Sequence, residues 1–470
     1  MKTSVLLLLL CLFSTFSFGQ SITLSPGTEQ QPAMINIGNA YRRGVEIPQI
    51  TSIERLRITS PSDGLTVFDT DKKGLCTYYA KAWYCSTKDS IVDYSTMQNF
   101  SPDSAANDKF GHAVDISGYW AVVGAAQTKV GNNANQGAVY YHGLAYGGES
   151  WLMVKKLVAP DGAANDNFGA SVALVGDYMV VGAPGANANT GAVYIFKQTS
   201  GVWAQEAKLT AADGATGDRF GTSVDFYKNA ANVPFVTIST SGDDLVSPTV
   251  SNIGSVYVFS PSAGIWTFQQ KIMNTEGSAN EGTEIIARMK DENTIVVAKP
   301  KARKDQEYNN GKIFTYRKSG NVWNLVQTFS AFAHDNLGHD LGISGNYMVV
   351  GGARIARVYQ YNPTTNLWFT TFATLVSPHQ YMVYYGYSVA IDGDRVLVRD
   401  VYDNFGVFFK RTGATNNTWV AYQTISTPGF CYNTGEGQLT AISEGYFIAG
   451  EGTNHCQKPG EVRFGVYNDK

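Results

Sequence analysis

Charged residues and histidine are scarce in this chain, and neither sign of charge is in excess. Of 470 residues, 16% are Asp, Glu, Lys or Arg, the formal net charge is −3, and there are six histidines. A near-neutral balance provides no basic surface for nucleic acid or anionic lipid. Beyond the first twenty residues, no apolar run approaches the 18 residues of a membrane-spanning helix. We therefore expect no nucleic-acid partner and no membrane insertion.

The first nineteen residues have the pattern of a cleaved leader. Lys2 precedes the apolar run Val5 to Phe13, and Ser17 and Gly19 are the small residues of a cleavage site. Cys11 follows Leu10 where a lipid-attachment signal has a small residue, so a plain secretory signal is favoured. We expect residues 1–19 to be a signal peptide and the mature protein to be secreted or cell-surface associated.

Cysteine is scarce as well, with five in the whole chain and four beyond the leader. An even number in an oxidising compartment predicts disulfides, and four cysteines allow three pairings. A zinc site is the alternative, but there is no C-x-x-C spacing and only His455 adjoins a cysteine. Proximity favours two local bridges and no metal: Cys76–Cys85 and Cys431–Cys456.

Glycine and aromatic residues are abundant, and they recur in a repeated unit. A Phe-Gly pair opens three units at Phe110-Gly111, Phe168-Gly169 and Phe220-Gly221. Weaker copies follow at Glu281-Gly282, Leu337-Gly338, Tyr385-Gly386 and Glu436-Gly437, at steps of 48 to 61 residues. Seven repeats of this length indicate a solenoid, an array or a propeller.

Each unit contains four short segments with the pattern of β-strands. In the second unit they read FGASVALVG, YMVVGAP, GAVYIFK and WAQEAKLTA, with apolar runs bounded by Gly, Asn or Asp. Four antiparallel strands repeated seven times predict an all-β, seven-bladed β-propeller. The last unit lacks its fourth segment, so Asp93 to Asp103 is predicted to close the last blade. A tryptophan begins the fourth segment in six units, which predicts packing between blades: Trp151, Trp203, Trp266, Trp323, Trp368 and Trp419.

The Phe-Gly and Gly-Ala-Pro units resemble the FG-GAP repeat family, best known from the seven-bladed propeller of integrin α chains and common in secreted bacterial proteins. The resemblance covers about 370 residues and is strongest in ANDKFGHAV, ANDNFGASV and TGDRFGTSV. Many family members carry a calcium loop between the first and second strands. Here that connection is a tight turn such as Val175 to Tyr178, with too few oxygen ligands for calcium. We expect no metal and no cofactor.

A separate segment precedes the propeller, and we place its bounds at residues 20–88, with the propeller at 89–470. It resembles a short module of bacterial surface and tail-fibre-like proteins, through Ile47-Pro48, Gly64-Leu65, Val67-Phe68 and Trp83. Thr51 to Ile58 is predicted to be a short helix. Leu65 to Phe68 and Thr77 to Tyr84 are predicted to form a hairpin.

Recurrent acids and dispersed histidines favour structure over catalysis. Asp108, Asp166 and Asp218 precede each Phe-Gly, and Asp103, Asp161 and Asp213 lie five residues earlier. Such a ring could bind a ligand, but Asp also shapes loops by bonding its own backbone, which we favour. His112 and His339 occupy one slot after Phe-Gly or Leu-Gly, and His334 with His339 is the only close pair. No nucleophile accompanies them, so we assign them a structural or surface role.

The loops that join blades and those that join second to third strands should share one face. They are rich in Asn, Gly and Ala, as suits carbohydrate or protein contact. The candidate ligand residues are Asn132, Asn133, Asn135, Asn187 and Asn189. We expect a non-enzymatic binding protein, acting on protein or carbohydrate at the cell surface or matrix. The alternative is a propeller enzyme, such as a glycoside hydrolase or lyase, with a site in the central channel.

Overall fold

The structure is a computed structural model, and its chain falls into two compact units, residues 1–93 and 94–470. It describes residues 36–37, 45–51, 54–55, 58, 61–70, 74–79, 82–85, 97–100, 108–145, 151–244, 250–273, 279–302, 310–330, 336–377, 385–400, 405–413, 417–426, 439–451 and 461–467. The expected leader, Asp103, His334, Cys431, Cys456 and the pair Glu436-Gly437 lie outside these residues.

The first unit contains a small mixed sheet with strand order β3-β4-β5-β6. β3 pairs parallel to β4, and the other two pairs are antiparallel. A two-stranded ladder, β1-β2, is the other described sheet of this unit. The bounds are β1 Asn36–Ile37, β2 Val45–Glu46, β3 Gln49–Ile50, β4 Thr66–Asp69, β5 Gly74–Tyr79 and β6 Ala82–Cys85.

The predicted hairpin of the first unit is only partly correct. β4 pairs with β5 as expected, but Thr77 to Tyr84 covers parts of two strands, because β5 and β6 pair antiparallel, with Tyr79 opposite Ala82. The apolar and aromatic residues from Thr77 to Tyr84 have one continuous strand pattern, so composition alone did not reveal two strands.

Two local contacts organise the first unit. Residues 54 and 55 are helical, and Thr51 and Glu54 form a capping box, with Thr51 N–H donating to Glu54 Oε2 at 2.8 Å. Arg55 Nε then donates to Asp69 Oδ2 at 2.8 Å, with both side chains buried. Cys76 is disulfide-bonded, and Cys85 is the residue opposite it in the backbone register.

The described residues of the second unit form seven antiparallel four-stranded sheets. The first three sheets correspond to the three strong repeat units. Their strands are β8 Phe110–Ser117, β9 Trp120–Ala125, β10 Ala138–Leu144, β11 Trp151–Leu157; β12 Ser171–Val175, β13 Tyr178–Ala183, β14 Ala192–Thr199, β15 Val202–Leu209; β16 Phe220–Lys228, β17 Pro234–Thr240, β18 Ser255–Ser262 and β19 Ile265–Met273.

The four weaker repeat units form the remaining sheets. Their strands are β20 Ile286–Asp291, β21 Thr294–Lys299, β22 Lys312–Ser319, β23 Val322–Ser330; β24 Asp340–Ser344, β25 Tyr347–Gly352, β26 Ile355–Asn362, β27 Leu367–Leu375; β28 Tyr385–Asp392, β29 Arg395–Asp400, β30 Phe405–Arg411, β31 Trp419–Ser426; β32 Thr440–Ser443, β33 Tyr446–Glu451 and β34 Glu461–Val466.

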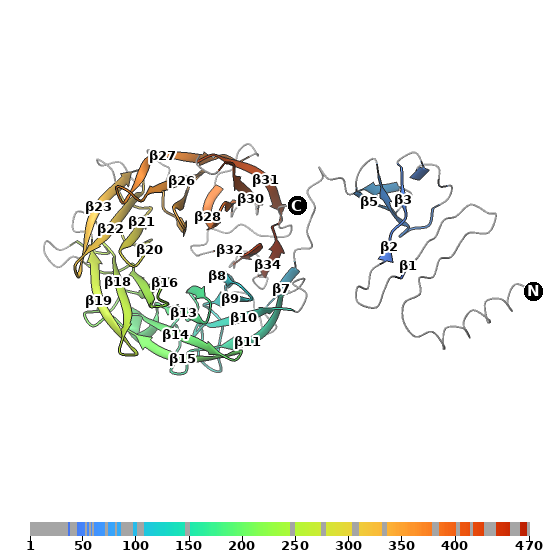
Figure 1. The fold of residues 1–470 in the computed structure, drawn as a ribbon. Helices are drawn as coiled ribbons and strands as arrows, with labels where there is room; N and C mark the ends of the chain where they lie inside the picture. The colour runs from blue at the N-terminus through green and yellow to red at the C-terminus, as the bar shows by residue number, and fades with distance from the viewer. Residues whose placement is uncertain are drawn as a thin grey trace, which may run out of the picture. The chain divides into compact units, whose positions relative to one another are not determined.

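The sheets are arranged in a propeller-like ring with the first strand of each nearest the axis (Figure 1). Each inner strand contacts the next around the ring, and β32 contacts β8, so first and last sheets meet. The last sheet takes its outer strand from before the first, because β7 Met97–Phe100 pairs antiparallel with β34. This closing strand is the one predicted from the sequence.

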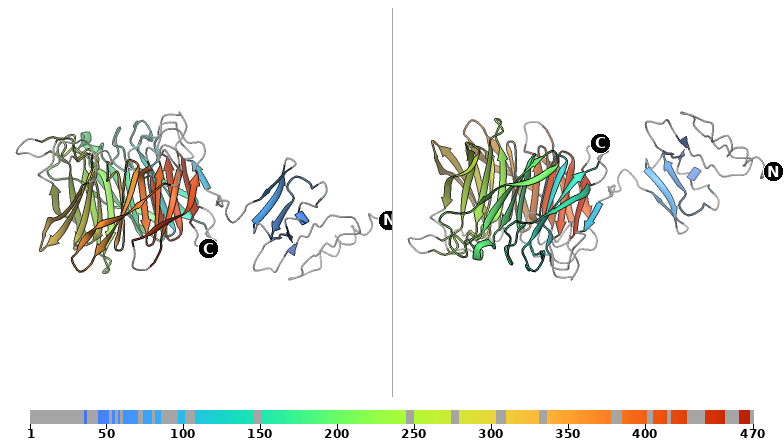
Figure 2. Two further views of the ribbon diagram at one scale, coloured as in Figure 1. Left: turned by 90° about the horizontal axis from the view of Figure 1, so that it is seen from above. Right: turned by 90° about the horizontal axis from the view of Figure 1, so that it is seen from below.

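The strands run between two faces that carry the connections (Figure 2). Tight turns join first and second strands, with Gly118, Gly176, Gly345 and Gly393 at φ between 55° and 59°. Only glycine adopts this backbone region without steric cost. We call the opposite face, which carries the connections between sheets and between second and third strands, the loop face.

The hydrophobic core lies between neighbouring sheets. Seven clusters of buried side chains each span two adjacent sheets, for example Val122 and Tyr141 with Val172 and Trp203. Trp151, Trp203, Trp323 and Trp368 belong to such clusters, while Trp266 and Trp419 pack against them. The tryptophans therefore lie between sheets.

Candidate functional site

In each strong repeat unit, the Phe-Gly pair anchors the end of the inter-sheet connection on the loop face. Phe110, Phe168 and Phe220 are fully buried, and each packs edge-on against the tyrosine of the third strand at 5.3 Å between centroids. Gly111, Gly169 and Gly221 follow with φ of 89° to 94°. This pair fixes where the connection between sheets ends and the next inner strand begins.

Loops of neighbouring sheets are hydrogen-bonded to one another on this face. Asn165 N–H donates to Ala134 O at 2.9 Å, and Phe168 N–H donates to Gln136 O at 2.9 Å. One junction further on, Gly217 and Arg219 donate to Asn189 O at 3.1 and 2.9 Å. Carbonyl groups of each second-to-third strand loop thus hold the connection that follows.

A cavity of about 390 Å³ opens on the loop face of the second sheet. It lies between the connection that enters the sheet and the loop between β13 and β14. Its polar lining comes from both, together with one lysine of the outer strand: Asp161, Asn165, Asp166, Asn187, Asn189 and Lys208. The alanines Ala163, Ala164 and Ala188 supply small apolar patches.

One wall of the cavity is the short turn α3, Ala186–Asn189. It is left-handed, with φ of 52°, 57° and 64° at Asn187, Ala188 and Asn189. Asn tolerates this region better than most residues, whereas Ala does so at a cost of roughly 1–2 kcal/mol. The turn keeps Asn187, Ala188 and Asn189 exposed while Ala186 is buried.

The opposite wall contains a hydrogen-bonded triad of Asp161, Tyr194 and Lys208. Tyr194 Oη donates to Asp161 Oδ1 at 2.9 Å, and Lys208 Nζ donates to Asp161 Oδ2 at 2.5 Å. The ammonium group also lies 5.1 Å from the centre of the Tyr194 ring. The triad joins the inter-sheet connection to the third and fourth strands.

The contacts within the triad favour the charged forms of Asp161 and Lys208. The hydrogen bond from Lys208 is the main influence on Asp161 and holds its pKa below the ordinary value. Burial is the largest single influence on Lys208 and lowers its pKa, but the hydrogen bonds and charge interactions with Asp161 and Tyr194 together outweigh it, so the net shift is upward. Burial raises the pKa of Tyr194 to about 12, so the phenol remains a donor.

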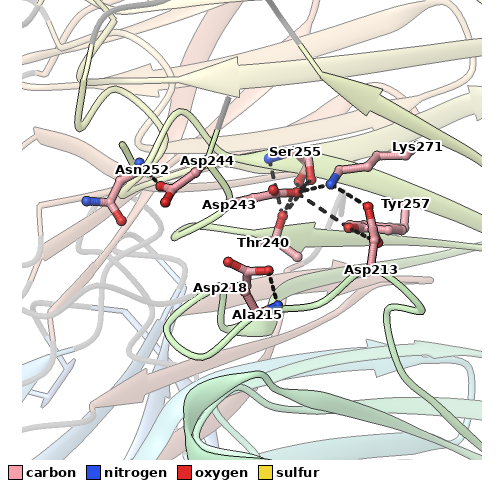
Figure 3. A network of polar contacts seen from close by, with 10 residues as sticks. All are labelled: Asp213, Ala215, Asp218, Thr240, Asp243, Asp244, Asn252, Ser255, Tyr257 and Lys271. Atoms are coloured by element: carbon pink, nitrogen blue, oxygen red, sulfur yellow. Dashed lines mark hydrogen bonds and ion pairs between the residues drawn. The ribbon is translucent and has the colours of Figure 1, made fainter. Parts of the chain in front are cut away.

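The third sheet has the same triad with an additional carboxylate (Figure 3). Lys271 Nζ lies 2.8 Å from Asp213 Oδ2 and 2.6 Å from Asp243 Oδ2, and Tyr257 donates to Asp213 at 2.8 Å. Asp243 also accepts a hydrogen bond from Ser255. The corresponding residue of the second sheet is Ala186, since both carbonyls accept the N–H of the glycine before the third strand.

The predicted ligand residues separate into three groups. Asn187 and Asn189 line the cavity. Asn133 Nδ2 instead donates to Gln136 Oε1 and Gly162 O, and Asn135 Nδ2 donates to Asn165 Oδ1, so both hold loops together. Asn132 is exposed on the same loop and does not line the cavity.

Lys208 and Tyr194 were missed by reasoning from the sequence, although a signal was present. They pair across β14 and β15, as Tyr140 pairs with Lys156 and Tyr257 with Lys271. A tyrosine and a lysine at fixed slots in three units indicate a shared contact. Asp161 was interpreted as a loop-shaping residue, and its contacts extend further, to two strands.

The aspartates just before Phe-Gly bond their own loops. Asp166 Oδ2 accepts the Ala163 N–H at 2.8 Å, and Asp218 Oδ2 accepts the Ala215 N–H at 2.7 Å. This is the side-chain-to-backbone contact expected of an Asp-containing turn. Asp166 thereby sets the shape of the connection that borders the cavity.

Three further aspartates lie on inner strands, where the enzyme alternative would need them. Asp115 Oδ2 accepts the N–H of Leu174 in the next sheet at 2.7 Å, and Asp225 Oδ2 accepts that of Met289 at 2.9 Å. Asp340 Oδ2 accepts the N–H of Val389 at 3.0 Å. Each carboxylate therefore links one inner strand to the next.

Arg288 influences all three of these carboxyl groups. Burial raises the pKa of Asp115 to about 7, while the backbone N–H groups of Leu174 and Ile116 and the charge of Arg288 oppose the shift. Burial also raises the pKa of Asp225 and Asp340, again opposed by Arg288. Arg288 Nε lies 3.9 Å from Asp225 Oδ1.

His339 lies beside the carboxylate of Glu284. Its Nδ1 lies 3.3 Å from Glu284 Oε2, and its ring stacks on Tyr387 at 4.1 Å between centroids. Glu284 also lies 2.5 Å from Lys301 Nζ. Burial lowers the pKa of His112, in the equivalent slot of the first sheet, to about 3.

The described part of the chain contains no group of three or more His, Cys, Asp or Glu side chains placed to hold a metal ion. Within the same residues, no helix is long and apolar enough to cross a bilayer.

The ring of sheets and its repeated Phe-Gly junctions define an all-β, propeller-like repeat protein. The model of the FG-GAP repeat matches residues 100–141, 151–196 and 203–259. The match lies over the three strong repeat units and covers less than half of the chain.

No curated protein matches the sequence. Among solved structures, a protein from Lactobacillus plantarum is similar with a TM-score of 0.48 and 16% identity, over 70% of this chain and 88% of that one. A periplasmic gluconolactonase from Pseudomonas aeruginosa is similar with a TM-score of 0.44 and 12% identity, over 78% and 94%. Similarity at this level carries no information on function.

Proposed function

We propose that this protein is an exported, non-enzymatic binding protein built on a closed seven-bladed β-propeller. It recognises carbohydrate or protein at the cell surface or in the matrix through the loop face. The observation that supports this most directly is the loop-face cavity, lined by Asn187, Asn189 and Asp161. Few convergent polar groups on a rigid scaffold are typical of binding sites.

The chemistry of the lining favours binding over turnover. The amides of Asn187 and Asn189 provide hydrogen-bond donors and acceptors but neither a nucleophile nor a titratable base. The carboxylate of Asp161 is paired with Lys208 and Tyr194. A general acid or base would need a pKa near the working pH, and that of Asp161 is shifted away from neutrality.

The test is a solid-phase binding assay of the purified protein against glycans and extracellular matrix proteins. We expect Asn187→Ala with Asn189→Ala to reduce binding at least tenfold, because two amide contacts are lost. Tyr119→Ala is the control, since Tyr119 is 73% exposed in the turn between β8 and β9 on the opposite face. Binding that survives the first variant but not the control would overturn the proposal.

A propeller enzyme is the second candidate, and the inner strands supply the observation in its favour. Asp115, with a pKa of about 7, is in the range of a general acid, and Asp225 and Arg288 influence it. Against this, both oxygens of Asp115 accept backbone N–H groups, from Ile116 and Leu174. Turnover of a polysaccharide panel that disappears in Asp115→Asn would favour the enzyme.

A further inference from the structure

An asparagine pair recurs where sheets meet on the loop face. Asn135 Nδ2 donates to Asn165 Oδ1 at 3.0 Å, and Asn252 Nδ2 donates to Asn280 Oδ1 at 2.8 Å. In each pair the first residue lies two positions before the glycine that begins the third strand. The second lies in the connection to the next sheet, three residues before Phe168 in one case and one before Glu281, which occupies the phenylalanine position, in the other. All four residues have φ between 53° and 69°.

The junction between the second and third sheets has only half of this pair. Asn189 occupies the first position, with φ of 64°, and Gly217 occupies the second, with φ of 102°. Gly217, three residues before Phe220, therefore corresponds to Asn165. The two loops still meet through the backbone, because Gly217 N–H donates to Asn189 O at 3.1 Å, whereas in the complete pairs the second residue donates to the residue before the first, Ala134 or Ser251. With no side chain at Gly217, the Asn189 amide has no hydrogen-bond partner among the residues that the structure describes.

Asn189 lines the loop-face cavity, and so does Asn165, whose Oδ1 already accepts a hydrogen bond from Asn135. Asn189 is exposed and lines that cavity with Asn187, whose amide likewise makes no hydrogen bond within the described residues. An unsatisfied amide at a cavity wall offers a donor and an acceptor to a ligand at no cost in broken contacts. With Gly217 in the position of Asn165, the Asn189 amide stays available at the cavity wall.

We propose that the cavity binds a neutral saccharide, with Asn187 and Asn189 as its principal hydrogen-bonding residues. This inference rests on the proposed binding function and specifies its ligand. Amides satisfy hydroxyl groups as both donors and acceptors. Ala163, Ala164 and Ala188 offer small apolar surface to the C–H groups of a sugar ring.

The charge of the cavity selects against ionic ligands. The positive charge of Lys208 is paired with Asp161 at 2.5 Å, and the second carboxylate, Asp166, is buried and bonded to Ala163 N–H. No cation in the lining is left for a sulfate or uronate group, since Lys208 is the only basic residue there. A neutral ligand requires no counter-charge, which matches this lining.

The sharpest test restores the missing side chain. Gly217→Asn should recapture the Asn189 amide and reduce affinity for the neutral saccharide about tenfold, the value of one to two hydrogen bonds. Gly217→Ala is the matched control. A Cβ at Gly217 meets no atom within 4 Å, so both variants avoid a steric clash and both place a side chain at φ of 102°, but only Asn carries the amide.

The probes are an array of neutral hexose oligosaccharides, with uronic-acid and sulfated oligosaccharides beside them, followed by calorimetric titration of the best neutral binder. Support would be a wild-type protein that binds neutral glycans, with Gly217→Asn weakened and Gly217→Ala within about twofold of wild type. Equal thermal unfolding of the two variants would show that any difference comes from the amide.

Three results would overturn the inference. Wild-type binding confined to charged glycans would contradict the ligand class, and equal affinity of Gly217→Asn and Gly217→Ala would contradict the role of the amide. Binding to a matrix protein through the loop face, with no glycan bound, would overturn the saccharide and leave the proposed function standing. If the wild-type protein bound neither glycans nor matrix proteins through the loop face, the proposed function itself would be contradicted.

Discussion

At the scale of single residues, the junctions between sheets depend on backbone that only glycine can supply. Gly137 and Gly191 have φ of 88° and 93°, and each forms a bridge with the phenylalanine of the next Phe-Gly pair. A Cβ at Gly191 would lie 2.1 Å from Phe220 O and 2.3 Å from its N. Close approach and positive φ coincide there, so the glycine is required for two reasons.

We predict that Gly191→Ala lowers the free energy of unfolding by more than about 3 kcal/mol, because a backbone clash adds to the cost of positive φ. Gly201→Ala separates the two causes. Gly201 has φ of 83°, but the nearest atom to its added Cβ is 4.0 Å away. The control should lose only about 1–2 kcal/mol in urea denaturation. Similar losses in the two variants would show that the clash is relieved by movement of Phe220.

At the scale of elements, six of the seven outer strands contribute a tryptophan to the core shared with the preceding sheet. Trp203 of β15 is 5% exposed and lies 6.1 Å from Trp120 of β9, centre to centre, with the rings at 85°. Tyr141 of β10 completes the group at 6.3 Å. Edge-to-face aromatic contacts of this kind add to the free energy gained from burial.

We predict that Trp203→Ala costs about 3–5 kcal/mol of the free energy of unfolding, the range for a buried aromatic residue. Trp266→Ala should cost less, because Trp266 is only partly buried and its Nε1 donates to Glu206. A double-mutant cycle of Trp203→Ala with Trp120→Ala measures the contact across the sheets. A coupling energy of zero would show that the two rings stabilise their own sheets separately.

The sequence was sufficient to predict the strands and hairpins wherever the repeat pattern is clear. Alternating apolar residues and turn glycines such as Gly176 define strands and hairpins locally, and the structure has them there. The separation of β5 from β6 was not predicted, because nothing in the composition between Thr77 and Tyr84 interrupts the strand pattern. Nor was the left-handed turn at Asn187, since Ala188 has no intrinsic preference for that backbone.

The candidate site could be predicted only in part, for a physical reason. The face of Asn187 and Asn189 follows from strand topology, and it is correct. Which asparagines are engaged follows from partners about 30 residues away, such as Asn165 for Asn135. A single sequence does not show which residues contact one another. Asn135 and Asn189 therefore have the same sequence pattern, and only the structure shows that Asn135 contacts Asn165 while Asn189 lies next to Gly217.

At the scale of the whole molecule, polar contacts between inner strands hold the ring together. Ser117, Ser344 and Ser443 each accept a backbone N–H from the turn of the neighbouring sheet, at 3.1, 2.9 and 3.5 Å. Asp115, Asp225 and Asp340 make the same type of link deeper in the sheets. A carboxylate in this position strengthens the link but bears the cost of a desolvated charge.

The cost of burying a carboxylate can be measured at Asp115 through the pH dependence of stability. Burial raises its pKa in the folded protein to about 7, against about 3.9 in an unfolded chain. Between these values the folded state retains a proton that the unfolded state releases. Stability therefore falls as the pH rises from about 4 to 7, by at most about 1.4 kcal/mol per pH unit. We predict a lower free energy of unfolding at pH 8 than at pH 5.

Asp115→Asn should reduce this difference, measured by urea denaturation at the two pH values, because the amide does not titrate. Asp225 and Asp340 remain in both proteins, so the change isolates Asp115. Asp161→Asn is the control: the pKa of Asp161 is lowered in the folded state, so its contribution is lost only in acid and is constant between pH 5 and 8. Identical pH profiles for wild type and Asp115→Asn would show that the Leu174 and Ile116 N–H groups keep the carboxylate charged throughout, and that the ring does not respond to pH through this residue.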